Sequence, residues 1–126
     1  MNQLVQYRRE FHYFPDIGWR EFRTSARIAE ILTEMGYDVV MGPELIDEKS
    51  IGEPERLDAN TVRAEMNRAI QQGATPSFVE QTKGLPGVMA VLDSGRLGPV
   101  TAFRFDIDAL PYPEKEEEGF RPFDEG

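Results

Sequence analysis

The sequence contains no cysteine and a single histidine, His12. Without cysteine the chain can form neither a disulfide framework nor a thiolate metal site; this suits a reducing compartment, and we predict a cytoplasmic protein. A zinc site needs three or four ligands, so His12 would have to be joined by several carboxylates. We therefore predict no independent metal site in this chain.

Long apolar runs and clustered basic side chains are missing as well. No apolar run approaches the roughly 18 residues that a membrane helix needs, and residues 1–9 lack the apolar core of a signal peptide. Asp and Glu (23) outnumber Lys and Arg (14), which gives a formal charge of −9. Because nucleic-acid binding depends on clustered Lys and Arg, this balance argues against nucleic acid and anionic membranes as partners.

The residues that are present are typical of a folded chain. Hydrophobic residues make up 40% of the 126 residues and charged residues 29%, a profile that favours a globular protein over a disordered one. A chain of this length forms one domain at most.

Helical periodicity dominates the first part of the chain. Apolar residues recur at helical spacing over 2–14 and again from about residue 19 to residue 35, and Pro15 separates the two runs. A β-branched run over 37–41 then predicts a strand. We expect the second helix to pack on a sheet through one apolar stripe, which consists of Phe22, Ala26, Ala29, Leu32 and Met35 and is widened by Ile28 and Ile31.

Residues 43–84 are interpreted as a helical insertion. Asp58 is a suitable N-cap for a helix that ends at Gly73, and Thr75 before Pro76 predicts the start of a further short helix.

Two short apolar runs follow, over 87–92 and 100–107, joined by turn-forming residues. They predict an antiparallel hairpin. Prolines and a run of glutamates then predict an irregular acidic tail over 111–126. The fold class that these elements predict is α/β, with N-terminal helices packed on a small mixed sheet.

Three charged residues alternate at the end of the last predicted strand: Arg104, Asp106 and Asp108. Alternate residues of an extended backbone project from the same face. Buried carboxylates need a cation or hydrogen-bonding partners, so this pattern fits a strand end beside a metal or catalytic site. It also fits a structural ion pair with an aspartate capping the next turn, and spacing alone favours this second interpretation.

Two motifs carry a resemblance to a known family. Residues 8–24 read RREFHYFPDIGWREFRT, and residues 98–111 read GPVTAFRFDIDALP after the apolar run 87–92. In this order they resemble the N-terminal part of the aminoacylase-like metallopeptidases, a family that includes hippurate, indole-acetyl-amino-acid and aminobenzoyl-glutamate hydrolases. The segment from Gly42 to Ala74 further resembles the A-subunit branch of the aminobenzoyl-glutamate hydrolases.

The resemblance implies that residues 1–126 form a partial catalytic domain. Family members bind zinc or manganese through a later His-Ala-Cys-Gly-His-Asp motif, paired glutamates and further histidines, and this sequence contains none of these motifs. By resemblance, Asp108 would be a supporting carboxylate beside the metal centre, and Asp106 and Arg104 would shape the same strand end. His12 and Glu21 would belong to the first helices. No cofactor and no complete catalytic set are therefore expected in this chain.

The function implied is that of a truncated metal-dependent amidohydrolase acting on small N-acyl amino acids or aminobenzoyl-glutamate, inactive alone. Two alternatives remain open. One is a non-catalytic binding or assembly protein, and the other is one half of a split hydrolase whose metal ligands come from another chain. Open sheet edges would allow self-association or the binding of a partner chain in either case.

Overall fold

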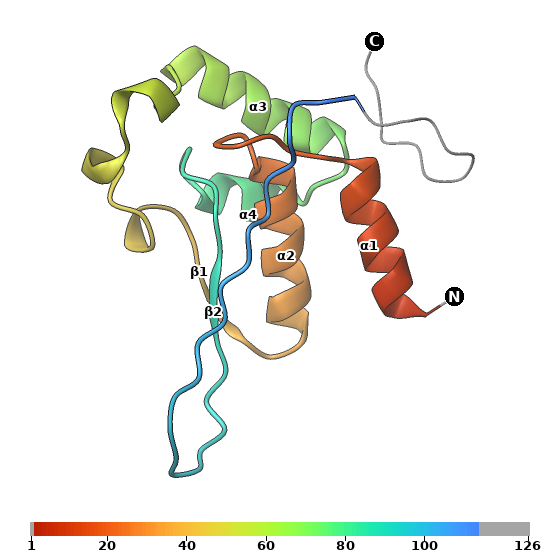
Figure 1. Ribbon diagram of the computed structural model, residues 1–126, viewed down its shortest axis with the longest axis vertical. Helices are drawn as coiled ribbons and strands as arrows, with labels where there is room; N and C mark the ends of the chain where they lie inside the picture. The colour runs from red at the N-terminus through yellow and green to blue at the C-terminus, as the bar shows by residue number, and fades with distance from the viewer. Residues whose placement is uncertain (1, 114–126) are drawn as a thin grey trace.

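We describe residues 2–113 of the chain from a computed structural model. This part of the chain forms helices, short 3-10 turns and two short strands around one small core (Figure 1). The helices are α1 (Gln3–Tyr13), α2 (Phe22–Glu34), α3 (Ala59–Gln71) and α4 (Pro76–Gln81); the strands are β1 (Asp38–Val40) and β2 (Met89–Val91); the 3-10 turns are η1 (Gly42–Glu44), η2 (Glu48–Ser50) and η3 (Glu53–Glu55).

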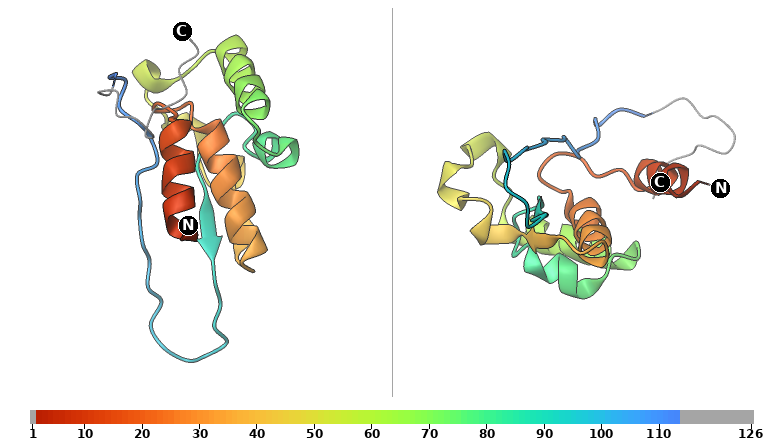
Figure 2. Two further views of the ribbon diagram at one scale, coloured as in Figure 1. Left: turned by 90° about the vertical axis from the view of Figure 1, so that its right-hand side faces the viewer. Right: turned by 90° about the horizontal axis from the view of Figure 1, so that it is seen from below.

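Helix α2 is the centre of the fold. It packs against α4, α3 and β1, and the views in Figure 2 show it between α1 and the α3–α4 pair. Phe22 and Ala26 on α2 meet Ala69 of α3 and Val79 of α4 in the buried core. The small alanine side chains allow these helices to approach closely, so Phe22 can fill the space between them.

The apolar stripe predicted on α2 is buried at its N-terminal end, but there it packs against α3 and α4 and not on a sheet as expected. Toward the C-terminal end Ile31 is still buried, and the stripe is wrong only at its last positions. Phe22, Ala26 and Ala29 are buried, whereas Leu32 is only half-buried and Met35 is exposed. The reason is that α3 and α4 cover only the first part of the helix.

The segment interpreted as a helical insertion supplies most of this core. Asp58 caps α3 as predicted, because its side chain accepts hydrogen bonds from the backbone amides of Asn60 and Thr61. Thr75 precedes α4 as predicted, but its hydroxyl donates to Glu30 Oε1 of α2 (2.7 Å) and makes no cap. Helices α3 and α4 are thus integral to the packing around α2. That residues 43–84 are an insertion stays a prediction.

The α/β class is confirmed, but the prediction of a mixed sheet is wrong for the described residues. Their sheet has two antiparallel strands, and β1 pairs with β2 so that Asp38 faces Val91 and Val40 faces Met89. The predicted hairpin between 87–92 and 100–107 does not form. Residues 93–99 form no tight two-residue turn that would fix a register, and β2 takes β1 as its partner instead. The parallel component is one isolated bridge between Ile17 and Ala109.

The chain after β2 is extended and open to solvent. Figure 1 shows it leaving the body of the fold as a long loop and returning toward α3. Many apolar side chains of β2 and of the chain after it are exposed, and we call them the apolar ribbon: Met89, Val91, Leu92, Leu97, Val100, Phe103, Phe105, Leu110 and Tyr112. An exposed apolar surface of this extent is typical of a surface that contacts another polypeptide.

Helix α1 is held to the body of the fold by charged contacts. Glu10 Oε1 lies 3.1 Å from Arg23 Nη2 and 2.8 Å from Arg27 Nε, both on α2. The Arg23 guanidinium also lies 3.8 Å from the centre of the Phe14 ring. No residue of α1 is buried, so these contacts orient the helix more than apolar packing does.

The predicted acidic tail falls largely outside the described residues. Residues 111–113 form neither helix nor strand, as predicted, and residues 114–126 lie beyond the described part of the chain. In that described part, no helix is long and apolar enough to cross a membrane.

Candidate functional site

The strand-end charges predicted from the sequence lie on an exposed, extended segment. Arg104 Nη2 and Asp106 Oδ1 form an ion pair at 2.7 Å, with the two side chains 86% and 70% exposed. The rings of Phe103 and Phe105 alternate with these charges and stack with their centroids 6.4 Å apart. The alternation expected from an extended backbone is therefore present, although the segment belongs to no strand. At Arg104 and Asp106 the geometry is that of a surface ion pair.

Asp108 is placed differently, because the next residue is anchored to the loop between α1 and α2. The Ala109 backbone amide donates to the Asp16 carbonyl oxygen over 2.7 Å. Asp108 Oδ2 lies about 4.0 Å from the position that a Cβ would take on Gly18. Asp108 is exposed at this loop, where another group can approach its carboxylate.

Glu21 lies close enough to Asp108 to experience its charge. The pKa of the Glu21 carboxyl is raised, chiefly because burial penalises the charged form, and the negative charges of Asp108 and Asp16 raise it further. Backbone amides of Glu21 and Trp19 donate to this carboxylate and oppose the increase in pKa. The loop and the extended segment thus bring together a half-buried carboxyl and an exposed one. A pair of this kind can accept and hold a proton or receive hydrogen bonds from a ligand.

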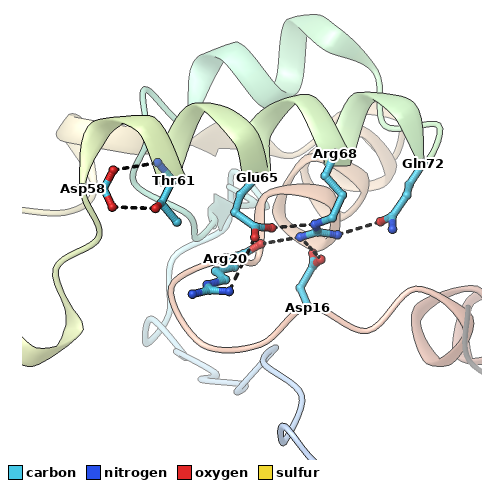
Figure 3. A network of polar contacts seen from close by, with 7 residues as sticks. All are labelled: Asp16, Arg20, Asp58, Thr61, Glu65, Arg68 and Gln72. Carbon is cyan, nitrogen blue, oxygen red and sulfur yellow. Dashed lines mark hydrogen bonds and ion pairs between the residues drawn. The ribbon is translucent and has the colours of Figure 1, made fainter. Parts of the chain in front are cut away.

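Asp16 fixes the loop that carries this pair (Figure 3). Its side chain is fully buried, and its Oδ1 lies 2.8 Å from Arg68 Nη2 of α3. Its Oδ2 accepts a hydrogen bond from the Thr24 backbone amide over 2.8 Å. The interaction with Thr24 ties the loop to the first turn of α2, and the ion pair with Arg68 ties it to α3.

Sequence reasoning did not identify Asp16 or Arg68. The two are far apart in the sequence, and a lone Asp after Pro15 is an ordinary turn residue. Nothing in the periodicity of residues 58–73 marks Arg68 as the partner of a buried carboxylate. Trp19 has a positive φ of 65°, a conformation that aromatic residues rarely adopt. No local feature of the sequence predicts this conformation.

The described residues do not assemble a complete metal site. Among residues 2–113, no group of three or more His, Asp or Glu side chains lies close enough to hold a metal ion. His12 lies in the last turn of α1 and belongs to no such group. Asp108 and Glu21 can support the ligands of a metal but cannot replace them, since a bound metal needs three or more ligands.

The Glu21 pKa gives a prediction for pH dependence. Because its folded-state pKa lies above the ordinary value of 4.5, protonated Glu21 favours folding, and this contribution is lost as pH rises through the folded-state pKa. Glu21→Gln should therefore raise the urea midpoint at pH 7, with the difference from wild type vanishing below about pH 4.5. The exposed Glu53→Gln is the matched control and should leave the midpoint unchanged. A lower midpoint for Glu21→Gln at pH 7 would show that the backbone hydrogen bonds to the carboxylate outweigh its burial.

The chain is similar in sequence to known hydrolases. No protein-family model matches the chain. The chain is 40% identical over 126 residues to the A subunit of p-aminobenzoyl-glutamate hydrolase from Escherichia coli (strain K12), a match that covers 98% of the chain and 28% of the relative. Indole-3-acetyl-aspartic acid hydrolase of Enterobacter agglomerans is 38% identical over 125 residues, with the same two coverages.

A solved structure shares the fold. The crystal structure of an aminobenzoyl-glutamate utilization protein from Klebsiella pneumoniae superposes with a TM-score of 0.80 at 40% identity. The match covers 86% of this chain and 27% of that chain, so the chain spans less than a third of the length of the proteins that it matches. The resemblance predicted from the two motifs is confirmed: over nearly its whole length, the chain is homologous to proteins named as the A subunit of p-aminobenzoyl-glutamate hydrolase.

Proposed function

We propose that this chain contributes one part of a metal-dependent amidohydrolase that cleaves N-acyl amino acids of the aminobenzoyl-glutamate or indole-acetyl-aspartate type. The observation that carries the proposal is the 40% identity to the aminobenzoyl-glutamate hydrolase relative over 98% of the chain. The names of the two relatives share one chemistry, the hydrolysis of an amide between an aromatic acyl group and an acidic amino acid.

Residues of this chain would support the reaction without performing it alone. Asp108 presents an exposed carboxylate that can accept a hydrogen bond from a metal-binding side chain, which fixes the orientation of that side chain. Glu21, whose pKa burial raises, can hold a proton beside it. A bound zinc or manganese ion would polarise the amide carbonyl and activate a water molecule. Its ligands would come from residues other than those described.

Turnover tests the proposal directly. The chain alone, with added zinc or manganese, should not hydrolyse aminobenzoyl-glutamate or indole-3-acetyl-aspartate. Mixing it with the portion of the Escherichia coli relative outside the matched 28% should produce hydrolysis. Failure of every mixture would contradict the proposal, and turnover by the chain alone would show that it carries its own metal site.

Asp108→Asn is the informative variant in that assay. It should lower the turnover of the mixture about 10- to 100-fold, the usual effect of removing a group that orients a metal ligand. Asp106→Asn is the matched control, because Asp106 is 70% exposed and paired with Arg104. Equal losses for the two variants would contradict a specific role of Asp108.

A second candidate function is supported by the apolar ribbon. Its exposed side chains adjoin β2, whose one pairing partner among the described residues is β1. The free edge of β2 offers backbone donors and acceptors to a further strand. A binding or assembly protein would use this edge to pair with a partner chain or with a second copy, and two of its relatives are named as one subunit of a hydrolase. Association without turnover in the mixing experiment favours this function.

A further inference from the structure

We propose that Arg68 of α3 is a positioning residue for Asp108, acting through Asp16 and the loop that Asp16 anchors. This role rests on the proposed function of Asp108 as a supporting carboxylate, but it concerns geometry that can be measured without turnover. It gives the α3 segment a function beyond core packing.

Asp16 is buried and needs a partner. Its side chain is 0% exposed, and a carboxylate taken out of water needs a compensating charge and hydrogen bonds. Arg68 supplies the charge at 2.8 Å, and the Thr24 backbone amide supplies a hydrogen bond. Arg68 therefore supplies the counter-charge that the buried Asp16 side chain needs in this loop.

Arg68 is itself held in place by several contacts. Its Nε donates to Glu65 Oε2 over 2.6 Å, and its Nη1 donates to Gln72 Oε1 over 2.8 Å, both acceptors belonging to the α3 segment (Figure 3). Its Nη2 donates to the Arg20 carbonyl oxygen (3.2 Å) as well as to Asp16. The guanidinium is thus held by its own helix on one side and contacts the loop at two points on the other. A planar guanidinium with several fixed donors holds its hydrogen-bond partners in a more defined geometry than a flexible ammonium does.

The loop in turn places Asp108. The carbonyl of Asp16, the residue that Arg68 holds, accepts the Ala109 amide at 2.7 Å. Ile17 forms the isolated bridge with Ala109. The residues before Asp108 belong to no strand and are mostly exposed, so their own packing does little to place the Asp108 carboxylate. The position of Asp108 over Gly18 then depends on the loop, and the loop depends on Arg68.

The test measures the electrostatic coupling between Asp108 and Glu21 in the folded chain. NMR titration of the Glu21 side chain would be performed for wild type, Asp108→Asn, Arg68→Gln and the double variant. In the wild-type background Asp108→Asn should lower the Glu21 pKa, because it removes a nearby negative charge. In the Arg68→Gln background the same change should lower the pKa by less than half as much, because Asp108 no longer lies beside the loop. Comparing the two differences removes the direct effect of the Arg68 charge on Glu21.

Asp16→Asn serves as a second background for the case in which Arg68→Gln leaves too little folded chain to titrate. Asparagine has the same shape as aspartate and removes the charge that pairs with Arg68. Arg104→Gln is the matched control, because Arg104 is an exposed arginine on the same segment as Asp108. In that background Asp108→Asn should act as in wild type. An undiminished effect of Asp108→Asn in both the Arg68→Gln and Asp16→Asn backgrounds would overturn the proposal, and so would a loss in the Arg104→Gln background.

Titration and turnover can fail independently of one another. Coupling that depends on Arg68, in a chain that yields no hydrolysis when mixed with the rest of a relative, would leave the positioning role intact and reject the hydrolase role. Hydrolysis with Arg68-independent coupling would do the reverse.

Discussion

Replacing Phe22 with alanine should lower the free energy of unfolding by about 3–5 kcal/mol, a loss large enough to abolish a cooperative transition in a chain of this size. Phe22 is 0% exposed and packs against residues of α2, α3 and α4. Truncation would remove apolar contacts and leave a cavity that the surrounding alanines are too small to fill. Urea denaturation followed by circular dichroism measures the change.

The chain contains its own control for this substitution. Phe103 is 78% exposed, so Phe103→Ala removes the same atoms from a side chain that solvent already surrounds. Its free energy of unfolding should stay within about 0.5 kcal/mol of wild type. If Phe103→Ala were as damaging as Phe22→Ala, the apolar ribbon would be buried in solution, by self-association or otherwise.

Arg68→Met should cost about 3–5 kcal/mol of folding stability, the usual result of breaking a buried ion pair from one side. The Arg68 side chain is 22% exposed and that of Asp16 is 0% exposed, so methionine would leave the Asp16 carboxylate buried with no counter-charge. Because methionine is apolar and similar in length to arginine, the loss of stability would come more from lost polar contacts than from lost side-chain volume. Urea denaturation at pH 7 measures it.

A double variant tests the cause. If the buried charge is responsible, Asp16→Asn combined with Arg68→Met should be less damaging than the sum of the two single changes, because no uncompensated charge remains. Arg104→Met is the exposed counterpart and should leave the urea midpoint unchanged. Strict additivity of Asp16→Asn and Arg68→Met would contradict the ion-pair explanation.

Local rules in the sequence predicted the helices well. Pro15, the Asp58 cap and Thr75 before Pro76 each mark a helix boundary through the geometry of one or two residues, and the structure places boundaries at or near all three. Gly73 ends α3 with a φ of 90°, a conformation that glycine adopts without strain.

The sheet and the site depend on contacts that no local rule contains. The runs 87–92 and 100–107 both have strand composition, but composition does not choose the partner, and β2 pairs with β1 across a long stretch of chain. The position of Asp108 depends likewise on Asp16, which is remote in sequence. The alternation of Arg104, Asp106 and Asp108 predicted a shared face, but it could not predict that the residue after Asp108 is anchored to the Asp16 loop. The two motifs predicted the relatives correctly because a resemblance between sequences depends only on the order of the residues. It does not require knowledge of which residues are in contact.

The sharing of one core by α2, α3 and α4 also has a consequence for the order of folding. Phe22 and Val79 meet in that core although half of the described chain separates them. Closing so long a loop costs entropy before any apolar contact repays it, so α2 gains little from forming early by itself. During synthesis the helix would wait, only transiently structured, until residues 69–79 had emerged, and β1 would share that delay because it packs on α2.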